Sequence, residues 1–203
     1  MLAAGKSSRL GKPKQLVLFN GKSLLKHGVE VAIDVTTEPV IVVLGANPEL
    51  LEKELVDQPV TVVINSEWEE GMASSIRCGL KKLLEISPNA DAAVIMVCDQ
   101  PFVTSELLTG LIEKYKETQK PIVASSYENS RGTPALFDKS IFALLIELKG
   151  DSGAKKIMKE HPDWVSEVEF PLGKIDIDTE EDEVLLQKYQ PPPYPPKGEG
   201  KNA

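Results

Sequence analysis

The stretch LAAGKSSRLGKPK at residues 2–14 places four cations within nine residues, with Gly5 before them and Gly11 among them: Lys6, Arg9, Lys12 and Lys14. Glycine lets the backbone approach a ligand closely, and lysine and arginine bind phosphate oxygens. The whole chain has a formal net charge of −8. On such an acidic background, a local cation cluster favours a compact anionic ligand over a long polyanion. We therefore expect a phosphate-binding loop here.

The loop does not have the pattern of a P-loop. Residues 5–7 spell Gly-Lys-Ser, but the first glycine of that motif would fall before Met1, so its presence cannot be tested. Residues 21–23 repeat Gly-Lys-Ser, with Leu16 where the first glycine should be. A P-loop continues directly into a helix, whereas this loop continues into Gly11 and Pro13, which disfavour helical geometry. The sequence predicts an extended, glycine-hinged loop.

Composition favours a single globular domain. The chain has 203 residues, of which 41% are hydrophobic and 27% are charged. No apolar run approaches the length of a membrane span, and no signal-peptide pattern opens the chain. Cys78 and Cys98 have neither metal-ligand spacing nor a disulfide framework. We expect a cytoplasmic protein that binds neither membranes nor nucleic acid.

Apolar, β-rich runs alternate with segments of helical spacing along the first two thirds of the chain. This alternation predicts an α/β sheet built from right-handed crossovers. The expected strands are residues 39–45, 60–65, 92–99 and 120–126. The expected helices are residues 23–34, 48–56, 72–86 and 105–117, the last capped by Thr104.

After residue 131 the alternation loosens. Residues 134–137 and 165–170 predict a short antiparallel or edge addition to the sheet. Further helices are expected near residues 140–148, 152–160 and 179–189, the last beginning at Thr179.

The two ends of the chain differ from the rest. Residues 191–203 are rich in proline, then glycine and lysine, and predict a disordered tail that follows a domain over residues 1–190. A docking segment for a partner is the alternative for this tail. At the other end, only three residues precede the loop, fewer than the usual strand of about five. We interpret the first strand as truncated and expect native residues before Met1.

Six short blocks follow one another along the chain: LAAGKSSRLGKPKQL (residues 2–16), GMASSIRCGL (71–80), VCDQPFV (97–103), RGTPALF (131–137), GDSGAKKI (150–157) and IDIDTEED (175–182). In this order they resemble the molybdenum cofactor cytidylyltransferase family, within the MobA-like NTP transferase superfamily that includes purine-catabolism relatives. The resemblance spans nearly the whole chain up to the tail. It implies a three-layer α/β/α nucleotidyltransferase fold, with a mostly parallel Rossmann-like sheet and a small antiparallel addition.

The resemblance implies that a terminal phosphate oxygen of molybdopterin cofactor attacks the α-phosphate of CTP and releases pyrophosphate. Such a reaction depends on positioning and charge neutralisation, so Mg²⁺ is the expected cofactor. A recipient molybdoenzyme is a possible partner. GTP as donor, or a sugar or alditol phosphate as acceptor, are alternatives. A non-catalytic chaperone that binds nucleotide or cofactor is a third hypothesis, and the presence of Arg9, Lys14 and Asp99 together argues against it.

Three residues are expected to carry the chemistry. Arg9 offers a planar fork and Lys14 a mobile charge for the leaving pyrophosphate. Asp99 ends a predicted strand, at the rim where open α/β sheets bind ligands, and it is the first expected metal ligand. Asp178 is the second expected ligand. Strand alternation puts Asp176 on the same face, so sequence alone hardly separates the two.

The remaining candidate residues bind substrates. By resemblance, the nucleotide contacts the backbone of the loop and the start of the helix at residue 72. The acceptor faces the two later blocks. The nucleotide-binding candidates are Leu2, Ala3, Ala4, Gly5, Arg9, Lys14, Gly71, Met72, Ser74 and Ser75. The acceptor-binding candidates are Gln100, Arg131, Gly132, Thr133, Pro134 and Asp151. Ala4 and Gln100 match the cytidylyl branch, which favours CTP over GTP.

Overall fold

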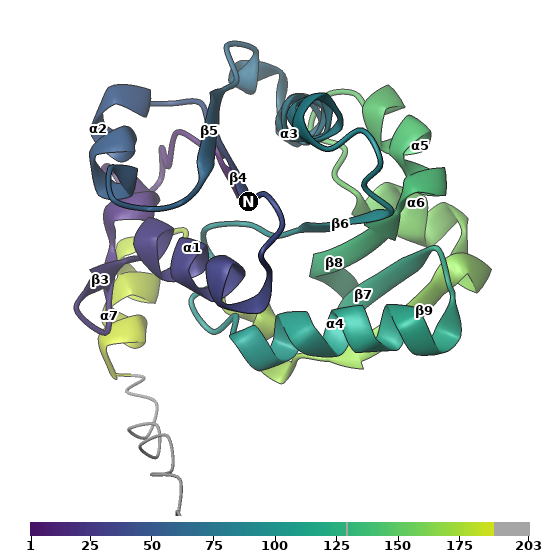
Figure 1. Cartoon of the computed structure of the whole chain (residues 1–203). Helices are drawn as coiled ribbons and strands as arrows, with labels where there is room; N and C mark the ends of the chain where they lie inside the picture. The colour runs from purple at the N-terminus through teal and green to yellow at the C-terminus, as the bar shows by residue number, and fades with distance from the viewer. Residues whose placement is uncertain (129, 189–203) are drawn as a thin grey trace, which may run out of the picture.

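The computed structural model describes residues 1–128 and 130–188, and its centre is a twisted β-sheet (Figure 1). The sheet has two parts. The smaller part consists of parallel strands in the order β1-β4-β5, and the larger part has the order β6-β8-β7-β9. A parallel bridge between Leu2 and Val97 joins the two parts. The strands are β1 (Leu2–Ala3), β4 (Ile41–Leu44), β5 (Thr61–Ile64), β6 (Ala92–Ile95), β7 (Ile122–Tyr127), β8 (Ser130–Asp138) and β9 (Val165–Glu169), with a separate hairpin of β2 (Leu18–Phe19) and β3 (Lys22–Ser23).

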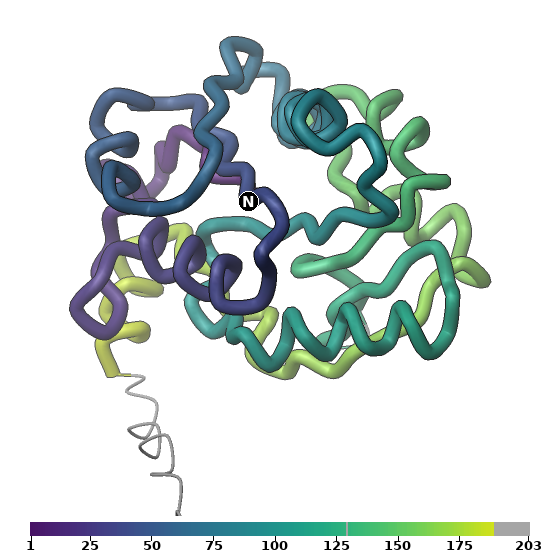
Figure 2. Tube along the Cα trace, viewed as in Figure 1, coloured from purple at the N-terminus to yellow at the C-terminus, as the bar shows by residue number. Residues whose placement is uncertain are grey.

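Helices cover both faces of this sheet, so the molecule has three layers (Figures 1 and 2). One core lies under α1 and α4, with Val29 and Leu111 at its centre. The other lies under α3, α5 and α6, around Ile76, Leu145 and Phe137. The helices are α1 (Leu24–Val35), α2 (Pro48–Glu52), α3 (Met72–Ile86), α4 (Ser105–Thr118), α5 (Phe142–Glu147), α6 (Lys155–Glu160) and α7 (Glu180–Lys188).

The three-layer α/β/α fold expected from the sequence is confirmed. Each helix predicted before residue 120 is present within a few residues of its expected bounds, and α3 has the bounds expected. The Thr104 hydroxyl caps α4 by accepting a hydrogen bond from the Leu107 amide at 3.3 Å. The loop over residues 4–13 contains no helix, as Gly11 and Pro13 indicate. The expected tail at residues 191–203 lies outside the described residues.

The antiparallel addition was predicted too short. Residues 134–137 form the middle of β8, a nine-residue strand that pairs antiparallel with both β6 and β7. The β7–β8 hairpin brings Ser130 opposite Tyr127, so the block at residues 131–134 lies in a strand and not in a turn. The sequence predicted a strand only from residue 134, because Gly132 and Pro134 weaken a strand pattern. β9 pairs parallel with β7 at the edge.

An apolar cavity separates β4 from β6. Its volume is about 740 Å³, and its walls come from the facing edges of these strands and from α1, α3 and α4. β1 enters this space for only two residues. The Met1 ammonium is buried beside it and donates to the Ile41 carbonyl at 2.6 Å. Burial lowers the pKa of this ammonium to about 5. Whether native residues precede Met1 stays a prediction.

No helix in residues 1–128 and 130–188 is both long enough and apolar enough to cross a bilayer.

The cavity predicts a stabilising variant. We expect an engineered extension Val-Ile-Val-Val before Met1 to pair between β4 and β6 and to move the amino terminus out of its buried position. Burial of the added side chains stabilises the fold, and ordering them costs conformational entropy. The free energy of unfolding should rise by a net amount on the order of 1–3 kcal/mol, which corresponds to several degrees in Tm. Thermal unfolding measures the gain. A Gly-Ser-Gly-Ser extension is the control, and equal Tm values for both extensions would contradict the expectation.

Candidate active site

The loop between β1 and Lys14 is fixed from inside by one buried amide. The Gln15 side chain is 1% exposed, and its Nε2 donates to the carbonyls of Ala3 at 2.8 Å and Gly5 at 2.9 Å. The Ser7 hydroxyl accepts a hydrogen bond from the Lys14 amide at 2.9 Å. These contacts hold the loop in one shape around its glycine. Sequence reasoning missed Gln15, because nothing in one sequence distinguishes it from a surface glutamine.

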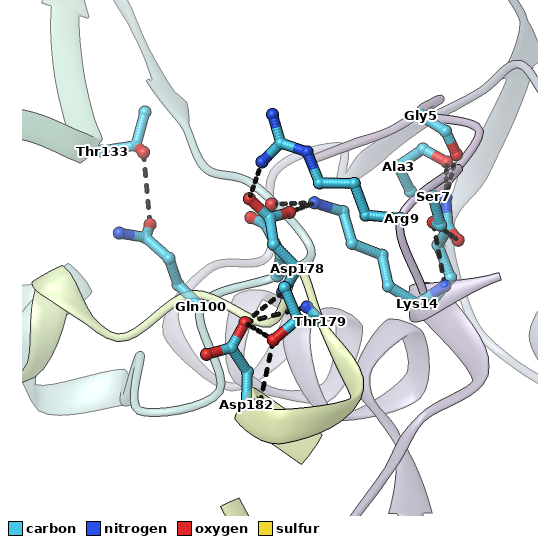
Figure 3. Close-up of polar contacts among 12 residues, drawn as sticks. Ala3, Gly5, Ser7, Arg9, Lys14, Gln100, Thr133, Asp178, Thr179 and Asp182 are labelled. Carbon is cyan, nitrogen blue, oxygen red and sulfur yellow. Dashed lines mark hydrogen bonds and ion pairs between the residues drawn. The ribbon is translucent and has the colours of Figure 1, made fainter. Parts of the chain in front are cut away.

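The Lys14 ammonium joins two carboxylates from distant parts of the chain (Figure 3). Its Nζ lies 2.5 Å from Asp99 Oδ2 and 2.9 Å from Asp178 Oδ1. Arg9 Nη1 lies 3.7 Å from Asp178 Oδ2 and is far more exposed. Burial opposes the charge of Lys14, but the charges and hydrogen bonds of Asp99 and Asp178 outweigh it and raise the pKa of Lys14. The structure thus brings together these four predicted residues.

Local structure holds both carboxylates in place. Asp99 lies in the turn after β6, and its carbonyl accepts a hydrogen bond from the Ile177 amide at 3.1 Å. Asp178 precedes α7, where Thr179 and Asp182 form a reciprocal cap: Asp182 accepts from the Thr179 amide at 2.8 Å, and the Thr179 hydroxyl accepts from the Asp182 amide at 3.2 Å. The Asp178 amide also donates to Asp182, at 3.1 Å.

The donor set fits one divalent metal ion. Asp99 and Asp178 already converge on a single cation, the Lys14 ammonium. Mg²⁺ and Mn²⁺ prefer oxygen ligands, and Mg²⁺ completes its shell with phosphates and waters, so two carboxylates suffice. No cluster of three or more His, Cys, Asp or Glu side chains suited to a metal occurs in the described ranges. Burial, then the charge of Asp99, raises the pKa of Asp176, which forms no ion pair with Lys14 among the contacts of the described residues.

The segment that holds both later aspartates is not a strand. Residues 175–178 have no regular structure, so the alternation used to place Asp176 and Asp178 on one face does not apply. Only Asp178 among these two forms an ion pair with Lys14.

At the start of α3, two serine hydroxyls turn into the protein. Ser74 and Ser75 are 2% and 5% exposed, and Asn65 Nδ2 donates to their hydroxyls at 2.8 and 3.1 Å. The Ser74 hydroxyl donates to the Gly71 carbonyl at 2.9 Å. Their proposed contact with base or ribose stays a prediction, and their observed role is to fix the first turn of α3. Sequence reasoning missed Asn65, which follows β5.

Close backbone approaches connect this turn to its neighbours. A Cβ at Gly45 would lie within 2.8 Å of both Trp68 and Ala4, so glycine lets the phosphate loop and the segment before α3 meet. Gly71 has φ +120, and a Cβ there would lie 2.4 Å from Asp151 Oδ1. The start of α3 therefore lies between the phosphate loop and the block that contains Asp151.

Of the residues expected to face the acceptor, some lie near Asp99 and others do not. Gln100 is buried beside Asp99; its Oε1 accepts from Thr133 Oγ1 at 3.2 Å, and its Nε2 donates to the Gly173 carbonyl at 3.0 Å. Thr133 and Pro134 are joined by a cis peptide bond. Arg131 instead pairs with Glu167, with 2.6 Å between Nε and Oε1, so the structure does not bring it to Lys14.

Tyr127 is a further residue that sequence reasoning missed. Its ring fills the space next to Gly132, where a Cβ would lie 2.2 Å from the phenol oxygen. Burial, then the charges of Asp176 and Asp99, raises the pKa of Tyr127. The β7–β8 hairpin, which the sequence did not reveal, positions it.

Comparison with known proteins gives one family match. A family model described as a MobA-like NTP transferase domain matches residues 1–165. The nicotine blue oxidoreductase of Paenarthrobacter nicotinovorans is 27% identical over 172 residues, which is 81% of this chain and 82% of that protein. A probable molybdenum cofactor guanylyltransferase of Bacillus cereus (strain ATCC 10987 / NRS 248) is 28% identical over 205 residues, covering 93% of this chain and 94% of the relative.

Solved structures agree with the fold. Rv0371c from Mycobacterium tuberculosis H37Rv superposes with a TM-score of 0.80 and 29% identity, covering 92% of this chain and 94% of that chain. A complex of Rv0371c with manganese has also been solved.

The buried network around Asn65 predicts a stability loss with a specific rescue. Asn65→Ala leaves the hydroxyls of Ser74 and Ser75 without their donor, which costs about 1–3 kcal/mol and lowers Tm by several degrees. Replacing both serines by alanine in the same variant should recover part of the loss, since no unpaired hydroxyl then remains. Thermal unfolding measures both effects, with Asn89→Ala as an exposed control. A loss no larger than that of the control would contradict this interpretation.

Proposed function

The chain belongs to the MobA-like NTP transferase family, and on that premise we propose that it transfers CMP from CTP to the terminal phosphate of a molybdopterin-type cofactor. Membership of this family makes the chain a nucleotidyltransferase. Choice of CTP, identity of the acceptor and use of Mg²⁺ are the proposed parts.

One observation carries the proposal. The Lys14 ammonium lies between Asp99 and Asp178, at the end of a loop rich in glycine and cations. Two carboxylates and a lysine at one point can bind a triphosphate together with its metal ion, because the lysine can turn to the phosphates while the carboxylates hold the metal.

The reaction forms one bond and breaks another at the same phosphorus. An oxygen of the acceptor phosphate attacks the α-phosphate of the donor, and the bond from the α-phosphorus to the bridging oxygen breaks to release pyrophosphate. Arg9 and Lys14 bind the departing pyrophosphate, and backbone amides of Ala4 and Gly5 orient the triphosphate. Asp99 and Asp178 would hold the metal ion, whose charge offsets that of the phosphate oxygens. No side chain forms or breaks a covalent bond in this reaction.

The choice of donor rests on family patterns. Ala4 and Gln100 match the cytidylyl branch, whereas the Bacillus cereus relative is named a probable guanylyltransferase. GTP is therefore the principal alternative donor. The manganese complex of Rv0371c supports a divalent metal ion without identifying the physiological one.

Pyrophosphate release tests the proposed reaction. The purified protein is incubated with each of the four NTPs, with and without molybdenum cofactor and Mg²⁺. We expect release from CTP that requires both cofactor and metal. Cofactor-dependent release from GTP alone would replace CTP by GTP as the donor. Tight nucleotide binding without release from any NTP would contradict the enzymatic function.

Asp99 is the residue whose loss tests the metal assignment. Asp99→Asn keeps the shape of the side chain but removes its charge, so we expect turnover to fall at least about 100-fold. Tm should change by no more than a few degrees, because Lys14 keeps its contact with Asp178. Asp91→Asn, which changes an exposed aspartate paired with Lys139, is the control. An active Asp99→Asn enzyme would remove Asp99 from the mechanism.

Lys14 should compete with the metal ion in the absence of nucleotide. Lys14→Met removes a cation that contacts both proposed ligands, so we expect Kd for Mn²⁺ to fall about tenfold or more while turnover is lost. Titration followed by Mn²⁺ electron paramagnetic resonance measures binding directly. Lys12→Met is the matched control, because Lys12 pairs with Glu183 outside the carboxylate pair. Unchanged Mn²⁺ affinity in Lys14→Met would place the metal elsewhere.

A further inference from the structure

We propose that Arg77 and Glu70 form a clamp that positions the acceptor-binding loop at residues 148–153 against the nucleotide-binding start of α3. Arg77 is thus a positioning residue for the second substrate. The inference rests on the proposed function and on the expected acceptor contact of Asp151, which lies in this loop.

The clamp joins three segments through one guanidinium. Arg77, on the second turn of α3, binds both carboxylate oxygens of Glu70; its Nη1 lies 3.0 Å from Glu70 Oε1. The same Nη1 donates to the Leu148 carbonyl at 2.7 Å. Glu70 Oε1 accepts from the Gly150 amide at 3.2 Å. Arg77 therefore binds the Leu148 carbonyl of the loop directly, and it holds the Gly150 amide of the loop through Glu70.

The geometry of these contacts distinguishes the clamp from an ordinary surface ion pair. The Arg77 side chain is 17% exposed, and its planar fork meets the carboxylate of Glu70 in a bidentate arrangement. The hydrogen bond from Arg77, then that from the Gly150 amide, lowers the pKa of Glu70. An exposed lysine could not replace this fork with the same geometry.

The loop held by the clamp lies directly on the start of α3. The Gly150 carbonyl accepts from the Ala73 amide at 3.1 Å. Cβ atoms at Gly71 and Gly153 would lie 2.4 Å from Asp151 Oδ1 and 2.7 Å from Met72 Sδ. These close approaches leave no free space between the loop and the start of α3. A shift of the loop would therefore move Asp151 relative to the proposed nucleotide site.

The two sides of this contact have separate supports. Asn65 fixes the start of α3 through Ser74 and Ser75, and this network does not involve Arg77. The loop at residues 148–153 joins the short helices α5 and α6. The clamp binds this loop at two points, the Leu148 carbonyl and the Gly150 amide. Breaking the clamp should therefore affect acceptor binding while nucleotide binding persists.

The experiment compares Arg77→Met, Arg77→Lys and Glu70→Gln with wild type, and uses Lys82→Met as the control. Lys82 lies on the same helix and pairs with Glu85 outside the clamp. Steady-state kinetics of pyrophosphate release give KM for the molybdenum cofactor acceptor, and calorimetry gives Kd for CTP. For Arg77→Met we expect the acceptor KM to rise about tenfold or more, with Kd for CTP within about twofold. Arg77→Lys should restore only part of the loss.

Hydrogen exchange provides a readout that does not depend on turnover. In Arg77→Met, the amides of residues 148–153 should exchange at least about tenfold faster, while those of residues 74–78 keep their protection. Equal effects on acceptor and nucleotide binding, or no change in exchange at residues 148–153, would overturn the clamp. If wild-type protein releases no pyrophosphate from any NTP, the proposed function fails, and the exchange measurement still decides whether the clamp exists.

Discussion

The arrangement of the site depends on the contact of one ammonium with two carboxylates. Lys14 comes from the first loop, Asp99 from the turn after β6, and Asp178 from the segment before α7. Two carboxylates that share one neighbour repel each other, and the Lys14 ammonium between Asp99 and Asp178 offsets that repulsion. The lysine therefore does in the free protein what a metal ion and phosphates would do in a complex: it joins the two ends of the chain to the middle of the sheet.

Sequence revealed the residues of the site better than it revealed their supports. Arg9 and Lys14 stand in a loop whose cations and glycines indicate phosphate binding, and Asp99 was expected at the end of a strand. The helices around them follow apolar periodicity. Gln15 and Asn65 gave no such signal. A buried amide that binds two carbonyls or two hydroxyls has the same sequence pattern as one on the surface, because its partners are set by tertiary structure.

The segment expected to face the acceptor was the least predictable part of the fold. β8 begins at a hairpin and carries glycine and proline, so local propensity favours a turn where the sheet imposes a strand. This strand places Thr133 beside Gln100 and gives Arg131 a partner in β9, Glu167, that is far away in sequence. Pairings of this kind arise from strand register, which a single sequence does not specify.

The cavity between β4 and β6 has a consequence for the protein under pressure. Unfolding eliminates internal voids, so it reduces the total volume of protein and water in proportion to the voids that the folded state contains. The cavity of about 740 Å³ is open to solvent, so only the part that water does not fill adds to this volume change. That part lies among the apolar walls between β4 and β6, whereas the loop at residues 4–13 is held from inside by the buried hydrogen bonds of Gln15.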